Sequence, residues 1–255
     1  MVLSVVFPGR VGYRAGLELQ RRLVDLRRAG RIDDVLVLLE HSPVVTLGRN
    51  AGREHVLLSE SDLKARGAEL VETNRGGDVT YHGPGQLVGY PIFDLRGPIR
   101  AQGKRLGPVD FVRQVEEALI RTTADYGVVT ERVAGRTGVW TRPSGTIPEK
   151  KIAAIGIHVS MGITSHGFAL NVTTDLRDFD WIVPCGIADR GVTSLEMEST
   201  AADLSLQTAA ERVSRHFGHV FQAQVLWLDS LNDLLPPSAS STKPAPTPQR
   251  GEREL

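Results

Sequence analysis

A run of twelve residues, Arg75-Gly-Gly-Asp-Val-Thr-Tyr-His-Gly-Pro-Gly-Gln86, limits the structures open to this chain more than any other segment. Four glycines and a proline exclude an ordinary core strand or helix. A predicted strand at 69–72 precedes the run and an apolar segment at 87–95 follows it, so we expect a loop held at both ends by a sheet. Such a loop lets a ligand approach main-chain N–H groups, and Arg75, Asp78, Tyr81 and His82 add polar side chains. The run is a candidate binding site, with a surface turn cluster as the alternative.

Composition places the chain among ordinary globular proteins. It has 255 residues, 41% of them hydrophobic, and its 30 basic residues balance 30 acidic ones. This supports one large domain and argues against a nucleic-acid partner. The apolar start at 1–7 has no basic region and runs into Pro8-Gly9, so we expect a first strand and no signal peptide. No apolar stretch approaches the ~20 residues that span a bilayer, so we expect no membrane association and a cytoplasmic protein.

The spacing of apolar residues predicts the main elements. We expect helices at 15–29, 109–126 and 207–221. Strands are expected at 35–40 and 43–48, the second ending at Arg49-Asn50, and a hairpin at 151–160 and 167–172 with its turn at 161–166. This pattern predicts an α/β (α+β) fold, a single domain with a mixed β-sheet flanked by helices. From 236 the composition shifts to Pro, Ser and Thr, so we expect a folded domain at 1–235 and a disordered tail at 236–255.

Cys185 is the single cysteine, within Ile182-Val-Pro-Cys-Gly-Ile187. It has no internal disulfide partner, which fits a reducing compartment, and the chain lacks the Cys and His spacing of structural zinc. A lone cysteine is more often an inert buried residue. A nucleophilic role requires a nearby cation or base that raises the thiolate fraction.

Basic side chains that could activate a thiol lie in two strands of small residues and in the glycine-rich run. Lys151 opens Lys151-Ile-Ala-Ala-Ile-Gly156, a strand against which a ligand could lie closely, although a lysine at a strand start is usually only solvated. His166 opens His166-Gly-Phe-Ala-Leu-Asn171, and His82 lies inside the run. Local chemistry alone leaves a Cys–His pairing of the hydrolase type open.

Five blocks of sequence, in this order, together resemble the octanoyltransferases of lipoate biosynthesis. They are the glycine-rich run, Gly138-Val-Trp140, Lys151-Ile-Ala-Ala-Ile-Gly156, His166-Gly-Phe-Ala-Leu-Asn171 and Pro184-Cys-Gly-Ile187. The motifs cover roughly residues 35–194, and the resemblance extends more loosely to about 234. It implies the mixed α/β fold shared by lipoate and biotin protein ligases, with 1–235 as a catalytic acyltransferase domain.

The resemblance also implies an activity and its residues. Members of this family move an octanoyl group from octanoyl-acyl carrier protein to a lysine of lipoyl domains, in 2-oxoacid dehydrogenase complexes and the glycine cleavage H protein. Cys185 matches the acyl-accepting nucleophile, and Lys151 matches the lysine that lowers its pKa and acts as general acid and base, with Lys150 a bystander. No metal or cofactor is implied, because the acyl group arrives as a thioester. The residues that match the substrate pocket are Arg75, Gly76, Gly77, Asp78, Val79, Thr80, Tyr81, His82, Ala154, Ile155, Gly156, Gly167, Phe168 and Ala169.

Three other functions compete with this interpretation. An ATP-dependent lipoate-protein ligase on the same fold would have no use for Cys185. A thiol hydrolase would pair Cys185 with His82 or His166 and pass the acyl group to water. A non-catalytic module that binds an acyl group or a lipoyl domain would never acylate Cys185.

Overall fold

The computed structural model of the chain describes residues 1–97, 100–101, 104–183 and 191–235. The tail predicted at 236–255 lies outside these residues. The helices are α1 Tyr13–Arg28, α2 Glu60–Ala65, α3 Pro108–Ala124, α4 Leu195–Glu198, α5 Leu206–Phe221 and α6 Leu231–Leu234, with 3-10 turns η1 Arg53–His55 and η2 Leu176–Trp181. The strands are β1 Val2–Val6, β2 Arg10–Val11, β3 Asp34–His41, β4 Val44–Leu47, β5 Glu69–Glu72, β6 Val79–His82, β7 Gln86–Ile92, β8 Arg100–Ala101, β9 Lys104–Arg105, β10 Thr130–Val133, β11 Arg136–Thr141, β12 Lys151–Ser160, β13 Ile163–Asn171 and β14 Gln224–Trp227.

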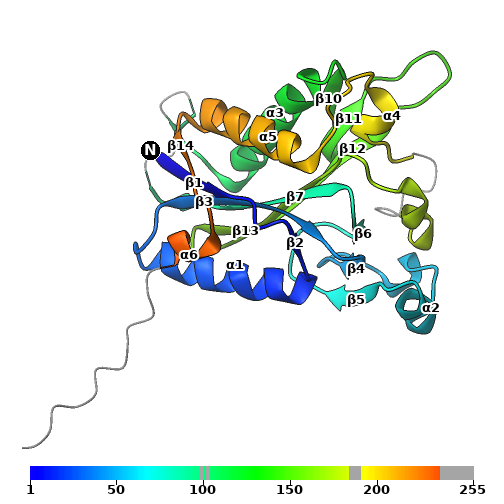
Figure 1. Cartoon of the computed structure of the whole chain (residues 1–255), viewed down its shortest axis with the longest axis horizontal. Helices are drawn as coiled ribbons and strands as arrows, with labels where there is room; N and C mark the ends of the chain where they lie inside the picture. Colours follow the sequence, from blue (N-terminus) through cyan, green and yellow to red (C-terminus); the bar gives the residue numbers. More distant parts are fainter. Residues whose placement is uncertain (98–99, 102–103, 184–190, 236–255) are drawn as a thin grey trace, which may run out of the picture.

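A nine-stranded mixed sheet forms the centre of the molecule (Figure 1). Its strands follow the order β10-β11-β12-β13-β7-β3-β1-β14, and β2 pairs beside β3. Neighbours from β10 to β3 are antiparallel, whereas β3, β1 and β14 are parallel. A smaller sheet, β5-β4-β6, carries part of the glycine-rich run. The predicted mixed sheet flanked by helices is confirmed.

Helices cover both faces of the large sheet. In Figure 1, α3 and α5 lie above it and α1 and α6 lie below. The upper face holds the larger apolar core, in which Phe93, Phe111, Phe217 and Phe221 form a ring cluster with centroids 5.0 to 5.4 Å apart. Burial of such aromatic side chains contributes about 1.5–3 kcal/mol each and anchors the helices to the sheet.

The three predicted helices are confirmed as α1, α3 and α5, with ends shifted by one or two residues. The strands predicted at 35–40, 43–48 and 69–72 are confirmed as β3, β4 and β5, and the first strand is β1. Periodicity is a sound guide to these elements because each buries one regular face.

Two predictions about turns are wrong. The run at 75–86 is not one loop, because Val79–His82 form β6, which pairs antiparallel with β4. The hairpin turn is not 161–166, because β13 begins at Ile163 and the turn consists of Met161 and Gly162, with φ of 49° and 81°. Positive φ at both turn residues matches the twist of the flanking strands, and a methionine gives no local sign of that conformation.

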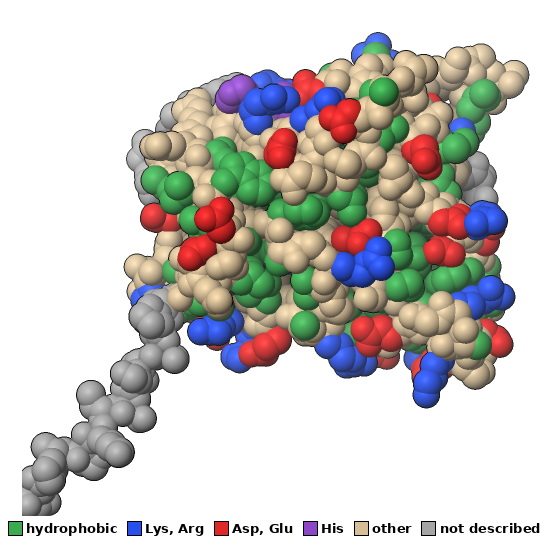
Figure 2. Space-filling view, viewed as in Figure 1, with side chains coloured by type: hydrophobic (Ala, Val, Ile, Leu, Met, Phe, Trp, Pro, Cys, Tyr) green, Lys and Arg blue, Asp and Glu red, His purple; other side chains and the backbone are tan. Residues whose placement is uncertain are grey.

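On the face shown in Figure 2, basic and acidic side chains are interspersed, and neither kind gathers into a large patch. Within the described part of the chain, no helix has the length and apolar character to cross a membrane.

Candidate active site

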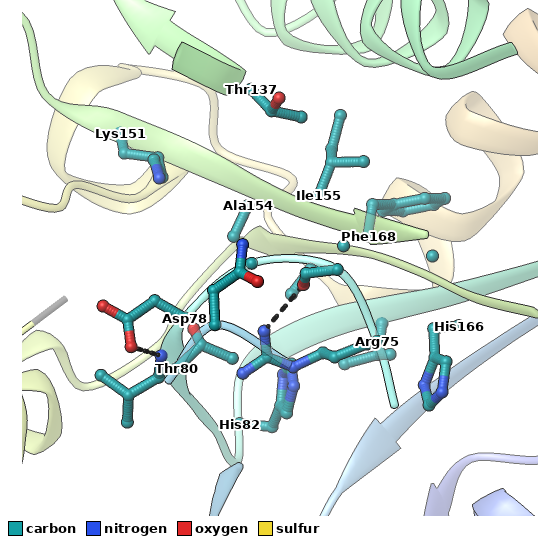
Figure 3. A pocket seen from close by; sticks show the side chains of 18 of the residues that line it. Arg75, Asp78, Thr80, His82, Thr137, Lys151, Ala154, Ile155, His166 and Phe168 are labelled. Carbon is teal, nitrogen blue, oxygen red and sulfur yellow. Dashed lines mark hydrogen bonds between the residues drawn. The ribbon is translucent and has the colours of Figure 1, made fainter. Parts of the chain in front are cut away.

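A cavity of about 440 Å³ lies where the glycine-rich run meets β12 and β13, a size typical of small-molecule sites. In Figure 3, Lys151 lies at one end and His166 toward the other, with Ala154, Ile155 and Phe168 between them. The cavity is lined by Tyr13, Asn50, Arg75, Gly76, Gly77, Asp78, Val79, Thr80, His82, Val88, Tyr90, Gly135, Arg136, Thr137, Trp140, Lys151, Ala154, Ile155, Gly156, His166, Gly167, Phe168 and Ala169.

The glycines of the run allow it to lie directly against β12. A Cβ atom at Gly156 would come within 2.6 Å of the Gly76 carbonyl oxygen, and one at Gly76 within 3.1 Å of the Ile157 oxygen. Gly77 has a φ of 88°, in the left-handed region. Backbone therefore forms part of the cavity wall at this crossing, which is the close approach expected of these small residues.

Arg75 braces the run from inside. Its side chain is buried, and its guanidinium donates to the Thr46 hydroxyl at 3.0 Å, the Thr46 carbonyl at 2.7 Å and the Gly76 carbonyl at 3.1 Å. These charge-assisted bonds fix the loop to β4. The cation also faces the buried end of the cavity, where it helps to lower the pKa of His166.

The histidines at this end are uncharged at neutral pH. Burial lowers the pKa of His82 to about 3, and burial, followed by the field of Arg75, lowers that of His166 to about 4. His82 Nδ1 lies 2.7 Å from Gln86 Oε1, and His166 Nε2 lies 2.6 Å from Asn74 Oδ1. Since both partners are amide oxygens, each imidazole donates here. Imidazoles with such low pKa values are weak general bases.

A chain of hydrogen bonds connects His82 to the opposite end. The Gln86 amide donates to Asn171 Oδ1 at 2.9 Å, and the Asn171 amide donates to the Thr193 carbonyl at 2.9 Å. The Thr193 N–H in turn donates to the Lys151 carbonyl at 2.9 Å. Buried and fully paired, this chain fixes the relative positions of β6, β13 and β12.

Lys151 presents an ammonium group at the open end. Its Nζ lies 4.7 Å from the centroid of the Trp140 ring, within cation–π range. Its backbone N–H donates to the Gly191 carbonyl at 3.1 Å, so the segment 191–193 pairs with the start of β12. The flat ring of Trp140 packs beside the flexible stem of Lys151 and so limits the rotamers that the lysine can adopt.

An ion pair lies next to the glycine-rich loop. His55 Nδ1 lies 2.8 Å from the Asp78 carboxylate, which raises the pKa of His55, and Asp78 also accepts the Val79 N–H at 2.7 Å. The His55 carbonyl accepts the N–H of Val183 at 2.8 Å, so the chain at 183 is attached beside Asp78.

Comparison with known proteins identifies the family. The lipoyl protein ligase A/B catalytic domain matches residues 12–218. The octanoyltransferase of Acidobacterium capsulatum is 63% identical over 95% of this chain and 100% of its own length. That of Koribacter versatilis is 54% identical over 92% and 90%.

The chain belongs to the octanoyltransferase family. It is therefore an acyltransferase. Solved structures agree on the fold: a putative lipoate protein ligase of Thermoplasma acidophilum with bound lipoic acid has a TM-score of 0.70 at 15% identity, over 90% of this chain and 89% of that one. A lipoate-protein ligase A bound with ATP gives 0.65 at 15% identity, over 90% and 89%.

Among the described residues, the structure gathers the site residues expected of an octanoyltransferase around one cavity, with one exception. Lys151 and thirteen of the fourteen expected pocket residues line it. Tyr81 instead packs against Phe179 and Trp181, and its hydroxyl donates to Asp178 at 2.5 Å. Cys185 lies outside the described residues. Within them, no group of three or more His, Cys, Asp or Glu side chains could hold a metal ion.

Several lining residues were not expected from the sequence. Tyr13 of α1 lies before the helix predicted at 15–29, and Tyr90 of β7 lies within the apolar segment at 87–95. Trp140 belongs to a family motif without an assigned role, and Asn50 follows a strand as a polar rim residue. Gly135 and Gly138, close to Trp140 in the sequence, could have indicated that β11 lies at the site. Glycines in a strand are typical of positions that a ligand or another backbone approaches closely.

Proposed function

We propose that this enzyme transfers the octanoyl group of octanoyl-acyl carrier protein to a lysine of lipoyl domains, through a thioester on Cys185. The catalytic unit is residues 1–235, acting in the cytoplasm. The acceptors are the lipoyl domains of 2-oxoacid dehydrogenase complexes and the glycine cleavage H protein. One observation carries the proposal most directly: Lys151 lies at the end of a cavity walled by the small-residue strands of the family.

The described residues on either side of the segment 184–190, which carries Cys185, support a partnership of the cysteine with Lys151. Val183 donates its N–H to the carbonyl of His55, the partner of Asp78, and Gly191 accepts the N–H of Lys151. Asp78 and Lys151 both line the cavity. The described residues that flank the cysteine's segment are thus bonded to residues at or next to the cavity. A cation close to a thiol lowers its pKa and raises the thiolate fraction.

In the first half-reaction the Cys185 thiolate attacks the thioester carbonyl of the donor. The carbon–sulfur bond to the carrier breaks, and the departing thiolate takes a proton from the Lys151 ammonium. This leaves an octanoyl thioester on Cys185 and a neutral Lys151. Because one thioester replaces another, the step is close to balance and requires neither ATP nor a metal.

In the second half-reaction a neutral lysine amine of the lipoyl domain attacks the acyl-enzyme. Lys151 accepts the proton that the amine nitrogen loses, the amide forms, and the Cys185 thiolate departs. The octanoyl chain lies along Val88, Ile155 and Phe168, where each buried methylene contributes about 0.8 kcal/mol. His82 and His166, held neutral by burial, take no proton in this cycle.

Intact-protein mass spectrometry with octanoyl carrier protein, without ATP, tests the proposal. Wild type should gain one octanoyl mass that added lipoyl domain discharges, Cys185→Ser should gain none, and Lys151→Ala should gain it slowly. Lys150→Ala is the matched control, since Lys150 lies beside Glu198 and not in the cavity, and should behave as wild type.

The other outcomes each support a different function. Transfer that requires ATP would support the ligase, and free octanoate without a modified lipoyl domain would support the hydrolase. If nothing is acylated under any condition, the chain acts as a binding module.

A further inference from the structure

Lys151 and Ala154 both line the cavity although they lie three positions apart on one strand. Side chains alternate along a regular strand, so two residues an odd number apart face opposite sides. Between them, Ile152 and Ala153 are both buried in the apolar core that α3 and α5 cover. The alternation is therefore interrupted between Lys151 and Ala154.

A β-bulge causes the interruption. β11 pairs Val139 with Ala153 and Trp140 with Lys151, so one step along β11 spans two residues of β12 and Ile152 is the extra one. A bulge re-aims the side chain that follows or precedes it. In a regular ladder with Ala154 on the cavity side, Lys151 would point into the core.

Glu116 of α3 accepts a hydrogen bond from β11, the strand that pairs with β12 at the bulge. Gly138 has a φ of 127°, and its N–H donates to Glu116 Oε1 at 3.1 Å. A Cβ atom at Gly138 would lie 2.7 Å from the Ala153 oxygen and 3.5 Å from Lys151 Cε. This glycine thus lets the Ala153 carbonyl of β12 approach β11 closely, while its N–H is held by Glu116.

The carboxylate of Glu116 is itself fixed. Its side chain is completely buried, and Oε2 accepts from Arg113 at 2.6 Å and from Arg132 at 3.1 Å. A buried carboxylate is costly unless it is paired on every side, and here both oxygens are occupied. An apolar residue would fill the same core position more simply, so the charge points to a requirement for an acceptor at Gly138.

We propose that Glu116 is a positioning residue for the acyl transfer: through the Gly138 N–H it fixes the bulge that turns Lys151 into the cavity. The proposal rests on the function assigned above to Lys151. Glu116 does not line the cavity, and its hydrogen bond to Gly138 connects it to the site through β11.

Glu116→Gln is the sharpest test because it is nearly isosteric. A carboxylate accepts at both oxygens, whereas an amide accepts at one end only. The glutamine must therefore lose either the Gly138 contact or the arginine contacts. The matched control is Glu117→Gln on the same helix, whose carboxylate bonds Arg121 and Arg132 but not β11.

We expect Glu116→Gln to lower kcat by about 10- to 100-fold with little change in KM for octanoyl carrier protein, because a small displacement of a reacting group has such an effect. Glu117→Gln should retain the kcat of wild type. Unfolded enzyme would also lower the apparent kcat at unchanged KM, so kcat is expressed per folded molecule, with the folded fraction of each variant taken from its thermal unfolding curve.

The pH dependence of Cys185 alkylation by iodoacetamide supplies a second readout. The midpoint pH should rise in Glu116→Gln toward the value in Lys151→Ala, and the double variant should match Lys151→Ala. Arg136, which lies over the Trp140 ring, and Lys150 stay unchanged in every variant, as do their partners Glu149 and Glu198.

The proposal is overturned if Glu116→Gln keeps the wild-type kcat and midpoint, or if the double variant shifts beyond Lys151→Ala. If Lys151→Ala itself leaves both quantities unchanged, the function assigned to Lys151 fails first. Should Glu116→Gln not fold, Glu116→Asp keeps the charge on a shorter stem that cannot reach both Gly138 and the arginines, and the same outcomes apply.

Discussion

The two ends of the cavity carry charge in different ways. At one end the Lys151 ammonium lies against the face of Trp140, on a half-buried side chain. At the other end His82 and His166 are buried with pKa values of about 3 and 4, and the Arg75 cation is occupied by hydrogen bonds to the loop and β4. In the function proposed above, the group that exchanges a proton is at the Lys151 end, whereas the buried end is a fixed polar framework.

Replacing Lys151 or Arg75 with methionine should separate these two roles, and we expect the Lys151 variant to show the largest effect of the changes described here. Lys151→Met should lower kcat by about 10²- to 10⁴-fold, the usual contribution of a general acid and base, with little change in stability. Arg75→Met should lower the free energy of unfolding by about 1–3 kcal/mol, because Thr46 and Gly76 lose their donor. Single-turnover kinetics and urea unfolding measure the two quantities. Equal losses of kcat without a difference in stability would contradict the division.

Adding a methyl group at Gly156, in the cavity wall between Lys151 and the buried histidines, should have a smaller effect. In Gly156→Ala the new Cβ would meet the Gly76 oxygen at 2.6 Å and push the glycine-rich loop away from β12. We expect a loss of about 1–3 kcal/mol in stability and a higher KM for the octanoyl donor. Gly12→Ala is the control, since its Cβ meets nothing within 4 Å. If Gly156→Ala has the control's KM, the loop does not form part of the binding wall.

The buried histidines should affect how the free energy of unfolding depends on pH. Burial lowers the pKa of His82 from 6.5 to about 3, so the unfolded state binds the proton first as the pH falls. The contribution is present above pH ~6.5 and is lost as the pH falls toward ~3. In His82→Asn, the slope of unfolding free energy against pH in this window should be shallower by up to about 1.4 kcal/mol per pH unit.

His55→Asn provides a contrast of opposite sign. Asp78 raises the pKa of His55, so its contribution is present below pH ~6.5 and is lost as the pH rises through the folded-state value. Unfolding curves of this variant should therefore differ from wild type at the acidic side and converge at the alkaline side.

A His82→Asn curve parallel to wild type between pH 4 and 6.5 would contradict the neutral, buried state of that histidine.

The smallest expected effect tests where the cavity ends within β6. Tyr81 belongs to the glycine-rich run but faces Phe179 and Asp178. Tyr81→Phe removes one hydrogen bond and should lower stability by about 0.5–1.5 kcal/mol without changing kcat or KM. Thermal unfolding and steady-state kinetics check both. A change in KM would indicate that the tyrosine reaches the substrate.

The sequence predicts elements well where one local pattern determines the outcome. Helical periodicity locates α3 to within two residues, and small-residue strands locate the cavity wall. The resemblance implies residue roles that the spacing of residues does not indicate. The resemblance assigns no role to Gly138 and Trp140, although both belong to one of its motifs.

Features that depend on distant partners were not predictable. β6 exists because β4 lies beside it, and β14 because β1 does. The bulge at Ile152 follows from the register of two strands, and His166 keeps a φ of 55° inside β13 because Gln20 of α1 accepts its N–H. Each is a tertiary effect that overrides local preference.

The place of β1 in the sheet has a consequence for biosynthesis. β1 lies between β3 and β14, and its pairing with β14 joins residues 2–5 to residues 224–227. At roughly 5–20 residues per second, a ribosome needs on the order of 10–40 s to deliver the second partner after the first. During that interval one edge of β1 is open to pairing with other chains. A nascent chain stopped before Gln224 keeps that edge open, so release of unfinished chains would favour intermolecular strand pairing.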